Sequence, residues 1–178
     1  MGNQVTIRIR HFRAGDEAAT SIIICRCLRE VNSADYPPDV IEGLAASFTP
    51  EKVARFPEGR ETFVAESGGA VVGTASLARD NSTPEEKYVC LTVFVLPEYH
   101  GRGVGKALIS RVEQAARDKG ATCLQVPSSV TALSFYAKLG YVPVSSSKPD
   151  PNEHWIWMTK SLSGPRDVAS PTMKSHDP

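Results

Sequence analysis

Residues 93–106 read VFVLPEYHGRGVGK and combine three signals of local structure. Val93 to Leu96 form an apolar, partly β-branched run, which is the composition of a buried strand. Pro97 ends that run, because proline cannot donate a hydrogen bond to a β-ladder. Three glycines follow at alternate positions, and apolar residues then recur at helical spacing as far as Gly120, which suits a left-handed helix end. The stretch therefore predicts a strand, a glycine-rich loop and a helix over residues 104–119.

This order of elements favours an anion-binding site. Glycines allow a backbone to approach a ligand closely and to adopt positive φ angles. The first N–H groups of a helix lack partners inside the helix, and the helix dipole makes that end positive, so a phosphate group fits there. Arg102 and Lys106 add positive charge at the same place. Ordinary turn glycines are the plainer interpretation, but three of them at alternate positions between a strand and a helix make it less favoured.

Two common phosphate-binding motifs do not fit this loop. The Walker pattern requires a glycine where His100 stands and a serine or threonine where Ala107 stands. The dinucleotide pattern G-x-G-x-x-G, started at Gly101, requires a glycine at Lys106. A nucleotide-phosphate binder is therefore the least favoured interpretation.

Two segments resemble the motifs of the GNAT N-acyltransferases. Residues 100–105, HGRGVG, resemble the family signature Gln/Arg-x-x-Gly-x-Gly/Ala, with His100 in place of the usual Gln or Arg. Residues 132–141, ALSFYAKLGY, resemble the later element A-x-x-F-Y-x-x-x-G-F/Y, and Ser129 stands where that element usually has Asn. The similarity in layout covers about residues 5–160, although only these two segments are specific.

The resemblance implies an α/β GNAT fold, with a mixed central sheet of about six to seven strands flanked by about four helices. Residues 1–160 would form the N-acetyltransferase domain, and residues 161–178, which lack periodicity, are expected to be a disordered tail. The implied activity moves an acetyl group from acetyl-CoA to a primary amine by direct transfer in a ternary complex. The acceptor would be a small molecule or a peptide, and a homodimer is left open. The implied cofactor-binding residues are Val93, Val95, His100, Gly101, Arg102, Gly103, Val104, Gly105, Lys106, Ser129, Phe135 and Tyr136.

Tyr136 is the implied catalytic residue, because it matches the family tyrosine whose hydroxyl reaches the sulfur of CoA. Its role would be general acid, and the backbone N–H of Val95 is the candidate donor to the developing oxyanion. The family's usual glutamate base would fall at Val89, where no carboxylate is available. Glu86, Glu153, His154 or deprotonation through water remain as alternatives. The missing base also favours an alternative function, a catalytically silent CoA-binding regulatory or interaction domain.

Composition bounds the remaining classes. The 178 residues suit one domain, and the 20 basic residues balance 20 acidic ones, which disfavours a nucleic-acid or membrane-surface partner. No apolar run is long enough for a membrane span, and no signal peptide is evident. Cys25 and Cys27 have neither zinc nor redox spacing, so we expect no metal site. The four cysteines lie in apolar stretches, which predicts reduced thiols and a cytoplasmic protein.

The rest of the chain alternates between strand and helix signals. Helices are expected over residues 16–31, 39–48 and 131–139, with Asp16 and Thr131 as N-caps. Between the first two of these helices the resemblance implies a wall of the acceptor pocket, which Asp35, Tyr36 and Phe48 would line; packing roles are the plainer interpretation of each. Strands are expected over residues 5–10, 62–66, 70–75, 87–95, 122–126, 141–144 and 155–159, the second and third joined by a hairpin at residues 67–69.

Overall fold

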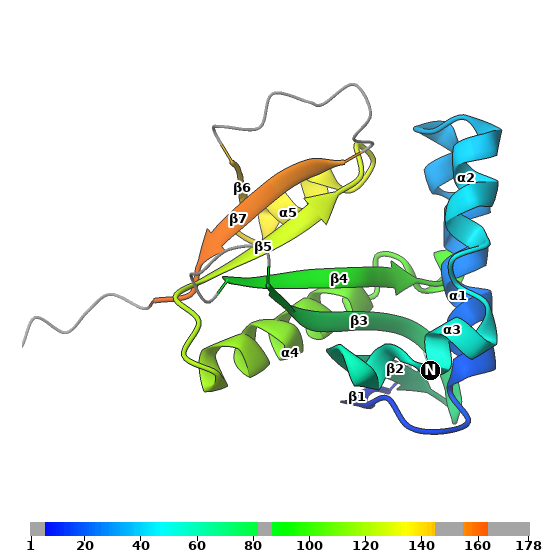
Figure 1. Ribbon diagram of the computed structural model, residues 1–178, viewed down its shortest axis with the longest axis horizontal. Helices are drawn as coiled ribbons and strands as arrows, with labels where there is room; N and C mark the ends of the chain where they lie inside the picture. Colours follow the sequence, from blue (N-terminus) through cyan, green and yellow to red (C-terminus); the bar gives the residue numbers. More distant parts are fainter. Residues whose placement is uncertain (1–5, 82–86, 145–154, 164–178) are drawn as a thin grey trace, which may run out of the picture.

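A seven-stranded mixed sheet organises the protein, with the spatial order β1-β2-β3-β4-β5-β7-β6. The computed structural model describes residues 6–81, 87–144 and 155–163 (Figure 1). The described strands are β1 (Ile7–His11), β2 (Arg60–Ser67), β3 (Ala70–Asp80), β4 (Lys87–Val95), β5 (Cys123–Ser128), β6 (Val142–Pro143) and β7 (Ile156–Ser161). The strand count agrees with the expected mixed sheet. β3 continues past the predicted end at residue 75, because the polar Ser76 hydrogen-bonds to Thr62 of the neighbouring strand β2 and does not end the strand.

The sheet consists of two antiparallel halves that meet at one parallel contact. β1 to β4 pair in sequence as an antiparallel meander, and β5, β7 and β6 form a second antiparallel group. Between the halves, β4 and β5 run parallel and pair at Val89 and Gln125 alone among the described residues. Figure 1 shows β4 and β5 diverging from this contact toward their carboxyl ends, on the side where α1 lies.

A β-bulge in β4 lies just after this contact. On one side of it Ser76 of β3 pairs with Leu91, and on the other side Thr74 pairs with Phe94. Two β4 residues, Thr92 and Val93, therefore stand opposite the single β3 residue that lies between Thr74 and Ser76. A bulge of this kind bends its strand and increases its twist. The position of the bulge thus coincides with the point where β4 leaves β5.

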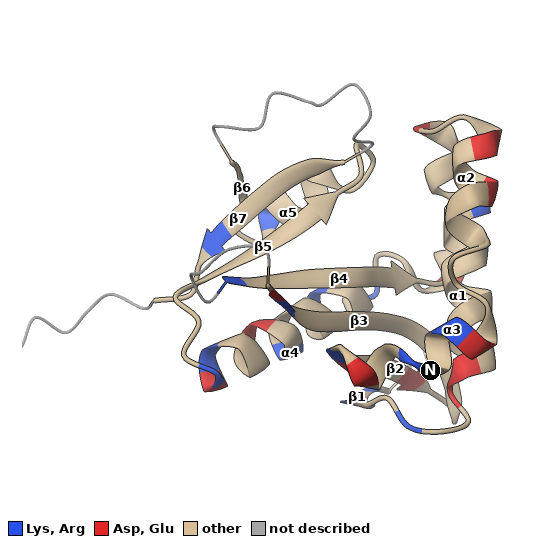
Figure 2. Ribbon diagram, viewed as in Figure 1, with Lys and Arg blue, Asp and Glu red and all other residues tan. Residues whose placement is uncertain are grey.

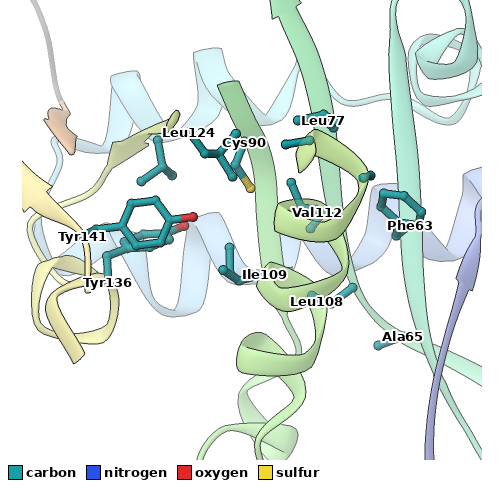
Figure 3. Close-up of a cluster of buried hydrophobic side chains, with 14 of the residues drawn as sticks. Phe63, Ala65, Leu77, Cys90, Leu108, Ile109, Val112, Leu124, Tyr136 and Tyr141 are labelled. Atoms are coloured by element: carbon teal, nitrogen blue, oxygen red, sulfur yellow. The ribbon is translucent and has the colours of Figure 1, made fainter. Parts of the chain in front are cut away.

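The helices cover both faces of the sheet. Five α-helices lie in the described residues: α1 (Glu17–Glu30), α2 (Pro38–Ala45), α3 (Pro50–Ala54), α4 (Val104–Asp118) and α5 (Leu133–Lys138). α4 packs against β1 to β4, and its apolar side enters a core with Phe63 and Leu124 (Figure 3). A second core, on the side of α1, α2 and α3, contains Ile24 and Phe56. The short α3 was not expected, since five residues are too few to show helical periodicity.

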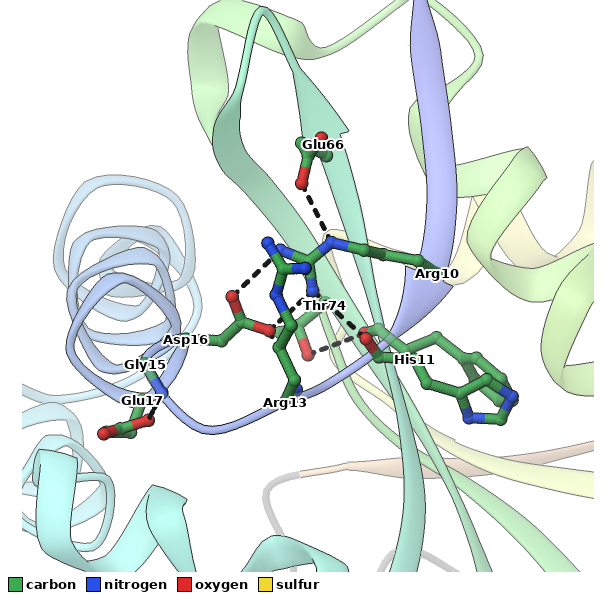
Figure 4. Close-up of polar contacts among 9 residues, drawn as sticks. Arg10, His11, Arg13, Gly15, Asp16, Glu17, Glu66 and Thr74 are labelled. Atoms are coloured by element: carbon green, nitrogen blue, oxygen red, sulfur yellow. Dashed lines mark hydrogen bonds and ion pairs between the residues drawn. The ribbon is translucent and has the colours of Figure 1, made fainter.

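Of the two predicted N-caps, Asp16 stands at the N-cap position of α1 without a side-chain hydrogen bond to the helix, and Thr131 is wrong. Asp16 does precede α1, but no side chain caps that helix, because the Asp16 carboxylate is held by Arg10 at 2.6 and 2.9 Å (Figure 4). Arg10 also donates to Glu66 at 2.8 Å, so one guanidinium joins β1, β2 and the start of α1. The other predicted cap, Thr131, hydrogen-bonds Asp35 instead, and α5 begins later, at Leu133.

The described chain continues past the predicted domain boundary at Lys160. Ser161 is the last residue of β7, and the side chain of Leu162 is only 5% exposed. The Leu162 N–H donates to the Thr122 carbonyl at 2.8 Å, and Arg117 donates to the Leu162 carbonyl. We therefore propose that the domain extends to about Leu162; the rest of the predicted tail, residues 164–178, lies outside the described residues.

Leu162 is expected to contribute to stability, whereas residues 164–178 are proposed to be dispensable. Leu162→Ala should lower the free energy of unfolding by about 2–3 kcal/mol, because it deletes a buried side chain. Deleting residues 164–178 should leave the melting temperature unchanged, as should the control Val142→Ala, whose side chain is exposed. Denaturant unfolding of the three variants tests this, and a large destabilisation by the deletion would contradict the proposal.

Candidate functional site

A cavity of about 560 Å³ opens where β4 and β5 diverge. α1 and α2 line one side of it, β4 and β5 the middle, and the loop before α4 together with α5 the other side. Eleven of the twelve predicted cofactor-binding residues line this single cavity; Arg102 is the exception. The structure thus brings together two motifs that are separate in the sequence, at residues 100–105 and 132–141.

The glycine loop ends in the helix start that its sequence predicts. Gly101 and Gly103 have φ angles of 72° and 79°, a left-handed conformation that L side chains rarely adopt. Gly103 is the N-cap of α4, and no described side chain caps that helix. The N–H groups of Val104, Gly105 and Lys106 therefore have no partner inside the helix and remain available to an anion.

Two cations flank this helix start. Lys106 lines the cavity with its side chain exposed, whereas Arg102 lies over the Tyr99 ring, with its Cζ 5.5 Å from the ring centroid. Across the described helices, basic and acidic residues are interspersed instead of being gathered by sign (Figure 2). The positive charge at this loop is therefore local.

His100, which departs from the family pattern, hydrogen-bonds to the end of β4. Its Nε2 lies 2.8 Å from the carbonyl oxygen of Val95, which can only accept, so Nε2 carries the hydrogen. The same carbonyl accepts from the Cys27 thiol at 3.1 Å. Val95 is opposite Gly73 on β3, yet these contacts show that its carbonyl points away from that strand. In an extended strand the N–H and C=O of one residue point to the same side, so the Val95 N–H also faces away from β3.

Gly105 lets the helix start approach α5. A Cβ atom at this position would lie 3.1 Å from Cζ of Phe135, closer than nearly all real Cβ contacts. Phe135 in turn packs edge-on against Tyr136, with ring centroids 5.1 Å apart. The glycine thus permits the close approach of the α4 start to the residue next to the predicted catalytic tyrosine.

Tyr136 is 4% exposed but lines the cavity. Its ring also packs edge-on against Tyr141, and in Figure 3 both hydroxyls are directed toward the side where Cys90 lies. Burial, followed by the proximity of Cys90, raises the Tyr136 pKa well above its usual value. The phenol therefore stays protonated at neutral pH, which is the state that a proton donor requires.

Cys27 and Cys90 are two thiols in the cavity wall that were not among the predicted site residues. Both cysteines are unpaired and buried, as the apolar surroundings in the sequence predict. Burial raises the pKa of Cys27 to about 12, and burial also raises the pKa of Cys90. Because the thiolate is the nucleophilic form of cysteine, neither thiol is suited to carry an acyl group.

The segment after α1 reaches across the cavity. Of the three residues suggested for the acceptor pocket, Tyr36 lines the cavity and Asp35 and Phe48 do not; Phe48 packs in the α1 core beside Phe56 and Phe94. The Asp35 carboxylate accepts hydrogen bonds from the N–H and hydroxyl of Thr131. Thr131 follows β5, so this contact joins the α1 side of the cavity to the β5 side. Long-range contacts of this kind leave no local signal in a sequence.

The general base is not identified among the described residues. Val89 is 7% exposed and pairs with β3 and β5, so no carboxylate stands at the family's usual place. The candidates Glu86, Glu153 and His154 lie outside the described residues.

Within residues 6–81, 87–144 and 155–163, no cluster of three potential metal ligands occurs. No helix in that part of the chain is long and apolar enough to cross a membrane.

Comparison with known proteins decides the family. The model of the acetyltransferase (GNAT) domain matches residues 32–162. The chain belongs to the GNAT acetyltransferase family. A GCN5-related N-acetyltransferase from Rhodopseudomonas palustris is 32% identical, with a TM-score of 0.73 over 88% of this chain and 96% of that chain. This match and the family model confirm the expected GNAT fold.

Two further relatives bear on the cofactor and the acceptor. The PaiA N-acetyltransferase of Thermoplasma acidophilum, solved with coenzyme A, shares the fold at a TM-score of 0.74 and 19% identity, over 88% of this chain and 99% of that one. Acetyl-CoA is the usual cofactor of the family, as expected. The N-alpha-acetyltransferase RimI of Mycobacterium tuberculosis is 37% identical over 43% of this chain and 49% of its own length. This chain spans about half the length of the curated relatives that it matches first, from 37% to 60%.

Replacing Gly103 is expected to weaken CoA binding without unfolding the protein. Gly103→Val places a β-branched residue at a φ of 79°, which shifts the backbone N–H groups that follow. Losing one or two hydrogen bonds to a charged group should lower affinity by about tenfold or more in calorimetry.

Gly15→Val is the matched control for this substitution. Gly15 has a φ of 98°, it also has open space around its Cβ position, and it precedes α1, outside the cavity lining. The control should lose a similar amount of stability, about 1–2 kcal/mol, but keep its CoA affinity. Equal affinity in both variants would show that the cofactor does not bind at the start of α4.

Proposed function

We propose that this protein is an N-acetyltransferase that moves an acetyl group from acetyl-CoA to a primary amine, by direct transfer in a ternary complex. The observation that carries the proposal is the single cavity in which an anion-binding helix start faces a buried, protonated tyrosine. Family membership supports the class of reaction, and the acceptor is proposed to be a small-molecule or peptide amine. The catalytic domain is proposed to end near Leu162.

The lining of the cavity supports this cofactor through its positive helix start and its apolar walls. The free N–H groups of the α4 start, with Lys106 and Arg102 nearby, would hold the pyrophosphate. His100, Gly101, Gly103, Val104 and Gly105, which all line the cavity, would form this cradle. Val93 and Val95 of β4, with Ser129 and Phe135 opposite, would line the channel for the pantetheine arm. Bound there, acetyl-CoA would supply an activated acetyl group on a thiol leaving group.

The chain's own groups then divide the chemical work. The Val95 N–H faces away from β3 and is the proposed donor to the oxygen on which negative charge develops. Tyr136 would deliver its hydroxyl proton to the departing sulfur. The protonated state of Cys27 and Cys90 supports direct attack by the amine over relay through a cysteine.

A catalytically silent CoA-binding domain is the alternative function. It is favoured by the absence of a carboxylate at Val89 and disfavoured by the position of Tyr136 in the cavity wall. Thiol release from acetyl-CoA in the presence of a panel of amines separates the two functions. CoA binding without turnover of any amine would support the silent domain.

Tyr136→Phe should remove catalysis while preserving the binding site. The phenylalanine keeps the ring and its packing against Phe135, so CoA affinity should change little. If the hydroxyl protonates the leaving sulfur, kcat should fall by about 10²-fold or more, which corresponds to roughly 3 kcal/mol of transition-state stabilisation.

Tyr141→Phe provides the matched control for that measurement. Tyr141 is a buried neighbour whose hydroxyl donates to Glu113 at 3.1 Å, and it does not line the cavity. Loss of the Tyr141 hydroxyl should lower the free energy of unfolding but leave kcat near normal. A Tyr136→Phe enzyme with near wild-type kcat, under conditions where chemistry limits the rate, would remove Tyr136 from the mechanism.

A further inference from the structure

Thr92 adopts a backbone conformation that its side chain disfavours. Among the described residues it is the one non-glycine residue with positive φ, at 50°. A β-branched residue there is an outlier, and bulges with a left-handed first residue normally place glycine at that position. Thr92 also lines the cavity, next to Val93. Strain of this kind persists only where surrounding contacts determine the conformation.

A chain of three hydroxyl groups supplies those contacts. Thr62 Oγ1 lies 2.9 Å from Ser76 Oγ, which lies 2.8 Å from Thr92 Oγ1. The three residues stand on β2, β3 and β4, and Ser76 is completely buried while Thr62 is 5% exposed. Inside a core a hydroxyl without a partner is destabilising, so each bond restrains the orientation of the next side chain.

The location of this chain connects it to the cavity. β4 pairs with β5 at Val89 and shows no further pair with it beyond the bulge in the described residues. The bulge shifts the β3 register by one residue, which sets the direction of the Val93 and Val95 backbone groups. We infer that the Thr62–Ser76–Thr92 hydroxyl chain is a positioning device for acyl transfer, holding the β4 bulge that aims these backbone groups into the cavity.

This inference rests on the proposed function, and it differs from two simpler roles for the same hydroxyls. Thr92 would act directly if its hydroxyl touched the reacting groups, and the chain would be merely structural if it only stabilised the fold. A positioning role predicts that Ser76, which does not line the cavity, affects turnover through Thr92. Four variants separate these roles: Ser76→Ala, Thr92→Ser, Thr92→Val and Thr92→Gly.

Ser76→Ala should lower kcat by about tenfold or more, since small displacements of reacting groups have large effects on rate. CoA affinity should stay within about threefold, because the anion-binding loop at residues 100–106 is unchanged. Thr74→Val is the matched control, because Thr74 lies on the same strand, is fully buried, and bonds the Phe63 carbonyl outside the hydroxyl chain. It should lower the melting temperature comparably while keeping kcat near wild type.

The Thr92 variants give the decisive comparison. Thr92→Ser keeps the hydroxyl and should rescue most of the activity that Thr92→Val loses. Thr92→Gly lacks the hydroxyl but adopts positive φ without strain, so its kcat should exceed that of Thr92→Val by several-fold. In the Thr92→Gly background, Ser76→Ala should change kcat by less than about twofold, because the anchored side chain is gone.

Hydrogen–deuterium exchange provides a readout that does not depend on turnover. Amides of residues 91–95 should exchange faster in Ser76→Ala than in Thr74→Val. If the wild type turns over no amine, the proposed function fails, and this exchange experiment still decides whether the chain anchors the bulge. Three results would overturn the inference: unchanged exchange at 91–95, a Ser76→Ala enzyme with normal kcat, or a Thr92→Gly enzyme as inactive as Thr92→Val.

Discussion

β4 pairs with β3 along most of its length but with β5 at one described position, and the cavity depends on this asymmetry. A sheet whose strands stayed paired would fill the space between β4 and β5 with backbone hydrogen bonds. Separation leaves the outward-facing N–H and C=O groups of β4 without a strand partner, which is costly for buried backbone unless other groups satisfy them. The Val95 carbonyl shows the solution, since it accepts from His100 and Cys27. The Val95 N–H points to the same side as this carbonyl, and in the proposed function it is left for a ligand.

Two halves of a sheet that share so little pairing need other connections. One connection is made by Glu113 of α4. This residue is 6% exposed, and its carboxylate accepts hydrogen bonds from Tyr141 at 3.1 Å and from Lys160 of β7 at 2.8 Å. A buried carboxylate without partners would be strongly destabilising, so these bonds bring the β6–β7 half against α4. The other connection is the Asp35 contact to Thr131, which joins the segment after α1 to the segment after β5. The cavity lies between these two connections.

The sequence predicts the parts of this arrangement that are local. The strand, glycine loop and helix of residues 93–118 follow from periodicity and from glycines whose positive φ the structure confirms at 101 and 103. The Thr92 bulge was not predictable in this way, because a β-branched threonine argues for extended strand and against positive φ. The roles of His100 and Asp35 were also missed, since each depends on a partner that only the fold brings near. Asp16 stands at the predicted N-cap of α1 but its carboxylate binds Arg10 and the Arg13 N–H, and Thr131 binds the distant Asp35 instead of capping α5.

The distribution of charge in the cavity also bears on how a ligand would lie in it. Lys106 and the exposed N–H groups at the α4 start place positive potential at one end. The other end is formed by Leu28, Val31 and Leu44 with the amide of Asn32 and the hydroxyl of Tyr36, and no described carboxylate lines it. The nearby acidic groups Glu30 and Glu42 are held by Arg26 and Arg29 on the surface. An elongated ligand with an anionic end and a neutral end would therefore bind in one orientation, with its neutral end between β4 and Tyr136. In the proposed function this orientation brings the acyl group to Tyr136 and leaves the α1–α2 side for the amine.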